Sequence, residues 1–282
     1  MNNYLGKKLA LHLAGQDHEV ACLVRHKAFS NAEFEKYDNL SILQADLLRE
    51  TYGSNMPLRT DVAFYVNEIS SERGGIYRDM ELISLQNYIK KLRRISCEHL
   101  IYLTRLRSPI AEDALQMLHK SYIPFTVVRT SNIIGKESTL MNIMGKLTSN
   151  KVILASSLIA KSRTQPIALK DVFSYLKFMI MNAQVFDRKF DLGGPDSLSY
   201  EEMVQKYLEI CQIKHRHIIQ LPIKNGCLPD LLLSFSTGLS RPSARAFLKT
   251  ASYDLLCEED GLQEIFPYQA TRFVEAVKLA IS

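Results

Sequence analysis

Residues 1–15, which read MNNYLGKKLALHLAG, decide how the rest of the chain is interpreted. Leu5, Leu9 and Leu13 recur at helical spacing, and Gly15 stands where a helix is expected to end. An apolar run that contains two valines follows from residue 20. The stretch therefore predicts a helix, a turn and a strand.

Within this stretch, Gly6 has the spacing of a partial phosphate-binding turn. In a nucleotide-binding βαβ unit, a turn of the form G-x-x-G-x-x-G lets the backbone approach a pyrophosphate at a helix N-terminus. Gly6 fits the last glycine of that spacing, and Asn3 takes the place of the middle one. We therefore expect Asn3, Tyr4, Leu5 and Gly6 to contact a dinucleotide. A glycine in the first turn of an ordinary helix is the alternative, because a lone match is weak.

One strand is unaccounted for, because a nucleotide-binding unit begins with a strand before its first helix. We expect that strand, and the first loop glycine, to be missing from residues 1–282. Either the natural polypeptide starts upstream of Met1, or the nucleotide site is degenerate. The intact mass of the native protein separates these two expectations.

The composition is that of an ordinary globular protein. The chain has 282 residues, of which 46% are hydrophobic, so one large domain with a substantial core is expected. The cysteines are odd in number, widely separated and without a C-x-x-C pair, which predicts reduced thiols in the cytoplasm and no metal site. They are Cys22, Cys97, Cys211, Cys227 and Cys257.

Charge and hydropathy exclude some classes of partner. No apolar run approaches the length of a membrane span, and the net charge of +5 is modest. The one dense basic cluster, residues 90–94, falls at the end of a predicted helix, where cations suit the helix dipole. We expect no nucleic-acid or membrane partner, only a small-molecule substrate or a dinucleotide.

Short β-rich runs alternate with helical patterns along the first half of the chain. This alternation predicts an α/β fold with a Rossmann-type, doubly wound parallel sheet covered by helices on both faces. The strands are expected at residues 18–25, 40–47, 60–67, 99–104 and 125–129, and the helices between them at 79–97 and 109–120.

Two strand ends carry side chains suited to an adenosine. In a doubly wound sheet, an arginine at the end of the second strand suits a ribose 2′-phosphate, so Arg25 points to NADP rather than NAD. Asp46 and Leu47 end the next strand and would lie beside the adenine ring. The alternatives are an exposed strand-end arginine for Arg25 and a turn cap for Asp46.

Further strand ends carry polar side chains. Ligands of such sheets bind beyond the carboxyl ends of the strands, so Asn67, Thr104 and Asn132 are expected to gather at the same edge. They complete the expected cofactor contacts.

Seven blocks carry a family resemblance and keep its order along the chain. Together they resemble the atypical short-chain dehydrogenase/reductases, and more narrowly the NmrA-like, NAD(P)H-binding branch close to the sugar-nucleotide epimerase-like proteins. The resemblance covers almost the whole chain. The blocks are YLG at 4–6, LVR at 23–25, ADL at 45–47, IYL at 101–103, VRTSNIIG at 128–135, TQPIALKDV at 164–172 and FDLGGPD at 190–196.

The resemblance implies an extended Rossmann domain that binds NAD(P) at the strand ends. Residues 1–160 would form this NAD(P)-binding core. Residues 161–282 would add the remaining sheet elements and a small, mainly helical C-terminal lobe that closes over the nicotinamide, in one structural unit with the core. In that lobe Leu231, Leu232 and Phe235 would line an apolar substrate pocket, although packing within the lobe explains them equally well.

The chemistry departs from the family, because residues 104–120 contain no Tyr-x-x-x-Lys pair. That pair normally exchanges a proton with the substrate during hydride transfer. A substitute donor would have to come from Arg105, His119 or Tyr102, of which Tyr102 is more readily explained as a core residue and His119 as a helix-surface one. Two functions remain: an NADP-dependent oxidoreductase or epimerase-like enzyme, with NAD as the other possible cofactor, and a non-catalytic NAD(P) sensor or scaffold.

Local signals also predict elements in the second half. Asp171 is expected to cap a helix over residues 171–183, and Ser199 with Glu202 forms a capping-box pattern at the start of another. Further helices are expected at residues 136–146 and 271–281, and a strand at 218–221. The turn DLGGPD at 191–196 is expected to be architectural.

Overall fold

The main sheet lies in two pieces in this computed structural model, which describes residues 4–25, 33–52, 56–67, 75–221, 227–258 and 261–282. The smaller piece has the order β1-β2-β3, with β1 and β2 parallel. The larger has the order β11-β6-β5-β4 and is parallel throughout. The strands are β1 (Val20–Val24), β2 (Leu40–Asp46), β3 (Thr51–Tyr52), β4 (Val62–Val66), β5 (His99–Arg105), β6 (Phe125–Thr130) and β11 (Arg188–Leu192).

This topology confirms the predicted parallel α/β sheet. In a doubly wound sheet of strand order 3-2-1-4-5, the first strand lies between the second and the fourth. Here β1 and β2 correspond to the second and third strands, and β4 to the fourth. Among the described residues no ladder joins β1 to β4, and this is the position that the first strand takes in such a sheet.

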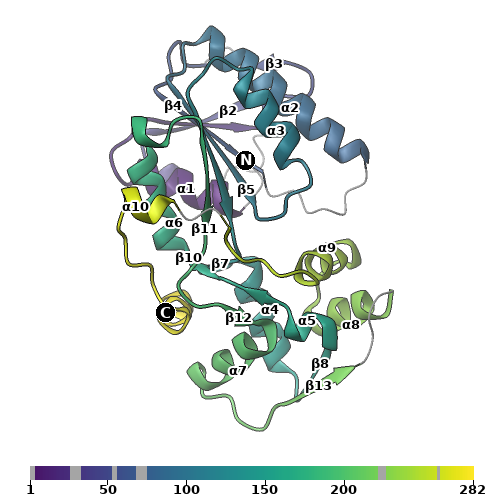
Figure 1. The fold of residues 1–282 in the computed structure, drawn as a ribbon. Coiled ribbons are helices and arrows are strands. Elements are labelled where there is room, and N and C mark those ends of the chain that lie inside the picture. The colour runs from purple at the N-terminus through teal and green to yellow at the C-terminus, as the bar shows by residue number, and fades with distance from the viewer. Residues whose placement is uncertain (1–3, 26–32, 53–55, 68–74, 222–226, 259–260) are drawn as a thin grey trace.

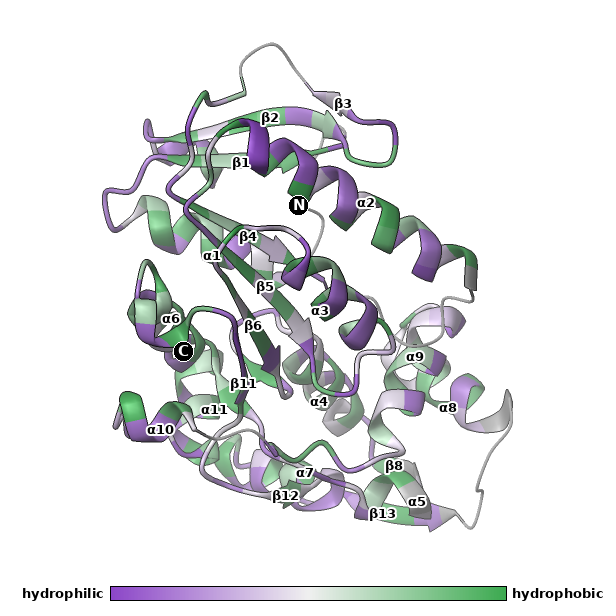
Figure 2. Cartoon of the chain, turned by 45° about the horizontal axis from the view of Figure 1, so that its top comes forward, coloured by the Kyte–Doolittle hydropathy of each residue, from purple (hydrophilic) through white to green (hydrophobic). Residues whose placement is uncertain are grey.

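Helices cover both faces of the larger sheet (Figure 1). The central strand β5 is buried on both sides, so its residues alternate between two cores: Ile101 and Leu103 pack with α1 and α6, whereas Leu100 and Tyr102 pack with α2 and α3. Figure 2 shows hydrophobic and hydrophilic residues alternating along α2, as one buried face requires. The helices are α1 (Tyr4–Ala14), α2 (Gly75–Arg94), α3 (Ala111–His119) and α6 (Leu169–Met179).

Helix α1 holds the two sheets together on one face. Leu5 and Leu9 belong to the core of the larger sheet, whereas Ala10 and Ala14 pack with residues of β1 and β2. On the other face α2 makes a similar link, because Asn87 Nδ2 donates to the Leu47 carbonyl oxygen at 2.7 Å. The two sheets are therefore positioned by helices that span both of them.

The second half of the chain adds a lobe that is mainly helical (Figure 1). Its two strands, β8 and β13, are parallel partners, and β13 confirms the strand expected near residues 218–221. Two short ladders, β7 with β10 and β9 with β12, lie next to the main sheet. The elements are β7 (Ile133–Ile134), α4 (Thr139–Ser149), β8 (Val152–Ser156), α5 (Ser157–Lys161), β9 (Arg163–Thr164), β10 (Ile167–Ala168), β12 (Leu198–Ser199), α7 (Tyr200–Ile210), β13 (His217–Leu221), α8 (Cys227–Thr237), α9 (Arg241–Ala251), α10 (Leu262–Ile265) and α11 (Phe273–Ile281), with single 3-10 turns at Phe34–Lys36 and Ala183–Val185.

Of two predicted helix starts, one is confirmed and one is wrong. Ser199 and Glu202 form the expected capping box at the start of α7. Asp171 does not cap α6, because the helix begins at Leu169, directly after β10, with Ala168 as its N-cap. The Asp171 carboxylate is instead buried and accepts hydrogen bonds from Tyr268 and Thr271, a hundred residues further along the chain.

His99, the first residue of β5, is fully buried and neutral. Its Nδ1 accepts from the Met181 backbone N–H at 3.3 Å, and its Nε2 lies 2.9 Å from Thr126 Oγ1. Because the Thr126 hydroxyl donates to the Val185 carbonyl oxygen, Nε2 is the donor to Thr126. Burial lowers the pKa of His99 to about 4.

This neutral histidine predicts a loss of stability in acid. A lowered folded-state pKa means that the unfolded chain binds the extra proton first, so the contribution is complete above pH 6.5 and is lost as the pH falls towards 4. The loss is on the order of 3 kcal/mol in the free energy of unfolding. We expect urea titrations between pH 7 and 4.5 to show a steeper decline for the native chain than for His99→Gln. Parallel declines in the two proteins would contradict the assignment.

Candidate functional site

The tips of β1 and β2 bring a cation and a carboxylate together. Arg25 Nε lies 3.8 Å from Asp46 Oδ1, and the Arg25 side chain is 50% exposed. Asp46 also accepts from the Leu48 backbone N–H at 3.1 Å, so it forms the turn given above as its alternative role. Leu47 is half-buried and packs partly against the core under α2. A solvent-accessible arginine held beside a carboxylate is thus available at this edge.

The start of α1 lies beside the loop that follows β7. A Cβ added to Gly135 would lie 2.4 Å from the Tyr4 hydroxyl oxygen, so this glycine permits the close approach. Leu5 is buried in the core and Gly6 is buried within the helix, so their side-chain positions face the protein interior. Asn3 lies outside the described residues.

Asn67, directly after β4, is buried against β5. Its Nδ2 donates to the Tyr102 hydroxyl oxygen at 3.0 Å. Burial raises the pKa of Tyr102, which is fully enclosed within the core. Tyr102 is therefore the core residue that the sequence favoured, and it is not placed to act as a proton donor to a ligand.

His119 is not at the strand tips either. Its ring packs edge-on against Phe125, with the centroids 4.9 Å apart. Phe125 begins β6, so His119 lies at the opposite edge of the parallel sheet from the carboxyl ends. The suggestion that it replaces the missing acid is wrong, because α3 runs back to the amino ends before β6 starts.

A buried polar network joins the ends of β5 and β6 to the lobe. Arg105 donates to Asn132 Oδ1 at 3.1 Å, and Asn132 Nδ2 donates to Thr164 Oγ1 at 3.2 Å and to the Tyr200 hydroxyl oxygen at 2.9 Å. Thr104 precedes Arg105 on β5, so its side chain lies on the other face of the sheet, the face of Tyr102. Its Oγ1 is buried and interacts with the Tyr102 hydroxyl. Of the two predicted residues, Asn132 is therefore part of this network and the Thr104 side chain is not.

Tyr200 is the member of this network that the sequence did not identify. It is the first residue of α7, and burial raises its pKa to about 12, although Asn132 and the Arg105 charge oppose that shift. Its hydroxyl is therefore protonated near neutral pH. The capping box predicts that α7 starts here, but no local pattern shows that the first side chain faces the strand ends.

An apolar hollow lies inside the lobe, and Tyr200 forms part of its wall. Leu232 lines it together with Met144 and Met203. Leu231 and Phe235 point outward instead and are 41% and 94% exposed. Of the three residues expected to line an apolar pocket, only Leu232 does so.

Two classes of site find no support within the described ranges. No three His, Cys, Asp or Glu side chains there lie close enough together to hold a metal ion. No described helix combines the length and the apolar character needed to cross a membrane.

Comparison with known proteins identifies the fold. No protein-family model matches the chain, and no curated protein matches it. Solved structures do match over almost the whole chain. A nucleoside-diphosphate-sugar epimerase from Staphylococcus aureus aligns with 14% identity and a TM-score of 0.71, covering 98% of this chain and 97% of that one.

Two reductases align equally well. The NADPH-dependent quinone oxidoreductase from Escherichia coli, solved with NADPH, has 13% identity and a TM-score of 0.71, covering 98% of this chain and 96% of that one. The triphenylmethane reductase from Citrobacter, solved with NADP(H), has 13% identity and a TM-score of 0.71, covering 99% and 97%. The expected resemblance to short-chain dehydrogenase/reductases is thereby confirmed at the level of the fold.

Proposed function

We propose that the chain binds a nicotinamide dinucleotide along the strand tips, with NADP preferred, and acts as an oxidoreductase or epimerase-like enzyme on a small substrate. The observation that carries the proposal is the pairing of Arg25 with Asp46 at the ends of β1 and β2. The structural neighbours solved with NADPH support the same kind of ligand. The free thiols of Cys22, Cys97 and Cys211 fit a cytoplasmic setting.

The described residues fit such a ligand at two points. Arg25 is exposed enough to meet a 2′-phosphate and lies 3.8 Å from Asp46. The N-terminal end of α1 carries the positive end of a helix dipole, which favours a phosphate beside it.

When bound, the dinucleotide would supply the hydride, and the protein would supply position and a proton. Arg105 and Asn132 would orient the substrate oxygen, because their side chains are already fixed by mutual hydrogen bonds. Tyr200 is the candidate proton donor, since it remains protonated at neutral pH while its oxygen accepts from Asn132. These three residues would take the place of the missing Tyr-x-x-x-Lys pair.

Substituting Arg25 tests the choice of cofactor. Arg25→Ala should weaken NADPH binding by about 10- to 100-fold while leaving NADH binding nearly unchanged, because only the 2′-phosphate loses a charge-assisted partner. Fluorescence titration with NADPH and with NADH measures the ratio of the two affinities. Arg59→Ala is the matched control, because Arg59 pairs with Asp61 and Glu98 at the opposite edge of the sheet. An unchanged NADPH-to-NADH ratio in Arg25→Ala would exclude the proposed role of Arg25.

A non-catalytic NAD(P) sensor is the second candidate, favoured by the exclusion of Tyr102 and His119 as proton donors. Tyr200→Phe separates the two candidates. For an enzyme we expect kcat to fall at least about 100-fold with NADPH affinity unchanged, as loss of a general acid requires. A sensor would bind NADPH without turnover of aldehydes, quinones or sugar nucleotides, with or without the Tyr200 hydroxyl.

A further inference from the structure

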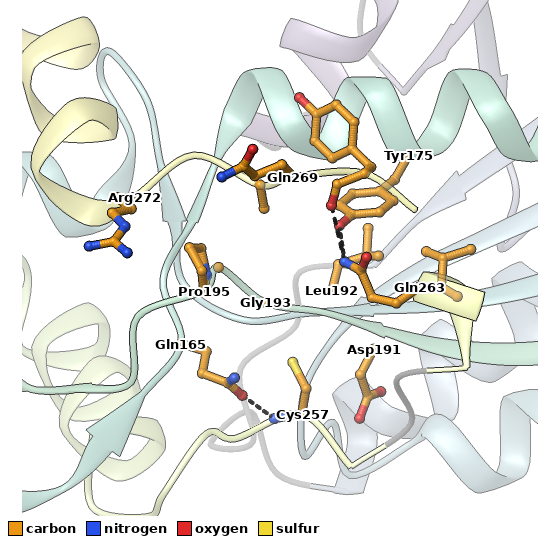
Figure 3. Close-up of a pocket in the computed structure, with 14 residues that line it drawn as sticks. Gln165, Tyr175, Asp191, Leu192, Gly193, Pro195, Cys257, Gln263, Gln269 and Arg272 are labelled. Atoms are coloured by element: carbon orange, nitrogen blue, oxygen red, sulfur yellow. Dashed lines mark hydrogen bonds between the residues drawn. The ribbon is translucent and has the colours of Figure 1, made fainter. Parts of the chain in front are cut away.

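A second hollow lies at the far side of the sheet, beyond the end of its outer strand β11. Its volume is about 370 Å³, which is within the range of small-molecule sites. Its walls come from Gln165, from Tyr175 of α6, from the turn at 192–195, from Cys257 and from residues within 262–272 (Figure 3). None of the strand-tip residues proposed to hold the dinucleotide lines it.

We propose that this hollow, called here the β11 cavity, binds a small hydroxylated metabolite that carries one anionic group, a carboxylate or a phosphate. The proposal goes beyond the dinucleotide site and does not depend on it. It is based on the rigidity of the walls, on their charge and on the hydrogen-bonding groups that they leave unused.

The walls are held in place by buried hydrogen bonds rather than by the ligand. The Asp171 carboxylate, which is fully buried, accepts from Tyr268 Oη, Thr271 N and Thr271 Oγ1 at 2.8, 2.7 and 2.9 Å. Asp196 accepts from the Phe273 backbone N–H at 2.7 Å. The C-terminal segment is thus fastened to α6 and to the turn after β11, so the cavity is preformed and a ligand need not order it.

The turn after β11 approaches its neighbours so closely that side chains are excluded. A Cβ on Gly194 would lie 2.1 Å from the Pro166 carbonyl oxygen, and one on Gly193 would lie 2.6 Å from the Cys257 Sγ. The glycines therefore fit this turn to the cavity wall, in line with the architectural role expected of the DLGGPD block.

Arg272 is the one charged lining residue whose donors are not taken by a carboxylate within the described ranges. Asp191 lines it, but both carboxylate oxygens accept from Arg129, at 2.6 and 2.9 Å, and one also accepts from the Glu258 backbone N–H. Arg272, by contrast, is exposed and has no carboxylate within 4.0 Å in the part of the chain that the structure describes. The carboxylates of Asp171 and Asp196 lie behind the wall and accept hydrogen bonds from hydroxyl and backbone N–H donors. The charged group left to contact a ligand is therefore the Arg272 guanidinium, which favours an anion.

Three amide side chains line the same cavity and provide neutral hydrogen-bonding groups (Figure 3). Gln165 uses its oxygen to accept from the Cys257 backbone N–H at 2.7 Å, so its NH₂ group is left to donate. Gln263 uses its nitrogen to donate to the Tyr175 hydroxyl at 2.9 Å, so its oxygen is left to accept. Gln269 is exposed on the rim. Such paired donors and acceptors match hydroxyl groups, which both donate and accept.

The test uses ligand-observed NMR on the full chain without any dinucleotide, so that its outcome is independent of the proposed cofactor site. The probes are glucose 6-phosphate, glycerol 3-phosphate and malate, with glucose and glycerol as neutral counterparts. We expect at least one anionic probe to bind with a Kd below about 10 mM, and each neutral counterpart to bind at least tenfold more weakly. Failure of all three anions to bind at that concentration would overturn the proposal.

Two conservative variants locate the binding. Arg272→Gln removes the charge, and Gln165→Glu keeps the oxygen that holds Cys257 while replacing the donor by a negative charge. Each variant should lower the affinity for the anionic probe at least tenfold and leave the NADPH affinity unchanged. Arg241→Gln, which removes an exposed arginine from α9, should change neither the probe affinity nor the NADPH affinity. Undiminished probe binding in Gln165→Glu and Arg272→Gln, with both variants folded by circular dichroism, would also overturn the proposal.

Discussion

Arg129→Met is expected to lower the free energy of unfolding by about 3–5 kcal/mol, the cost of leaving a buried charge without its partner. Arg129 and Asp191 are directly paired in the ladder between β6 and β11, and the Asp191 side chain is only 1% exposed. The guanidinium donates to both carboxylate oxygens, at 2.6 and 2.9 Å. Without it, the carboxylate loses its cationic partner and keeps a neutral donor, the Glu258 backbone N–H. Urea titration followed by circular dichroism measures the loss.

A double variant separates the buried charge from lost packing. Arg129→Met with Asp191→Leu removes both charges, so it should be more stable than Arg129→Met alone, because no unpaired carboxylate is left. Arg59→Met removes an arginine that pairs with Asp61 and Glu98 at the surface, and should cost far less stability than Arg129→Met. A similarly small cost for Arg129→Met would mean that Asp191 finds water or another partner when Arg129 is gone.

The sheet and its covering helices were predictable because their sequence patterns are local. β5 reads as a continuous apolar run, and such a run requires cover on both faces, which the structure provides. α1 carries leucines at helical spacing that reach the core of the larger sheet.

The errors arise where a residue is controlled by distant parts of the chain. Asp171 has the composition of a helix cap, but the short ladder of β10 with β7 sets the start of α6 two residues earlier. An imidazole can donate a proton, so the residue type makes His119 a candidate acid. The direction of α3 shows that it lies at the amino ends of the strands, away from the carboxyl ends where a ligand would bind. Tyr200 was missed because its partners, Asn132 and Arg105, are 68 and 95 residues away along the chain.

The β11 cavity was beyond sequence analysis for the same reason. Its lining residues are spread from Gln165 to Arg272, and they meet where hydrogen bonds and apolar packing hold the C-terminal segment against α6. The FDLGGPD block marks one wall of it. Nothing in that block indicates that the opposite wall is a segment about sixty residues later in the chain. Nor does it show that the lining carboxylate, Asp191, is paired with Arg129 of β6.

Asp171→Ala should therefore loosen the C-terminal segment and destabilise the whole chain. Three donors lose a fully buried acceptor at once, and each unsatisfied buried donor costs about 1–3 kcal/mol, so a total of about 3–5 kcal/mol is expected after partial relaxation. Hydrogen exchange localises the effect: amides between residues 261 and 273 should lose protection more than those of β5, because only the former segment is tied down by this carboxylate.

Asp171→Asn is the graded control for this contact. It keeps the oxygen that can accept from Tyr268 and Thr271 but replaces the other with an NH₂ group that faces the Thr271 N–H, so it should lose less stability than alanine and more than a surface substitution. Both variants should also lower the affinity of the β11 cavity for the anionic probe. The loss of affinity should grow with the loss of amide protection, since binding would then have to order the wall. Normal protection of residues 261–273 in Asp171→Ala would show that packing of Phe273 and Leu262 in the core holds this wall without the carboxylate.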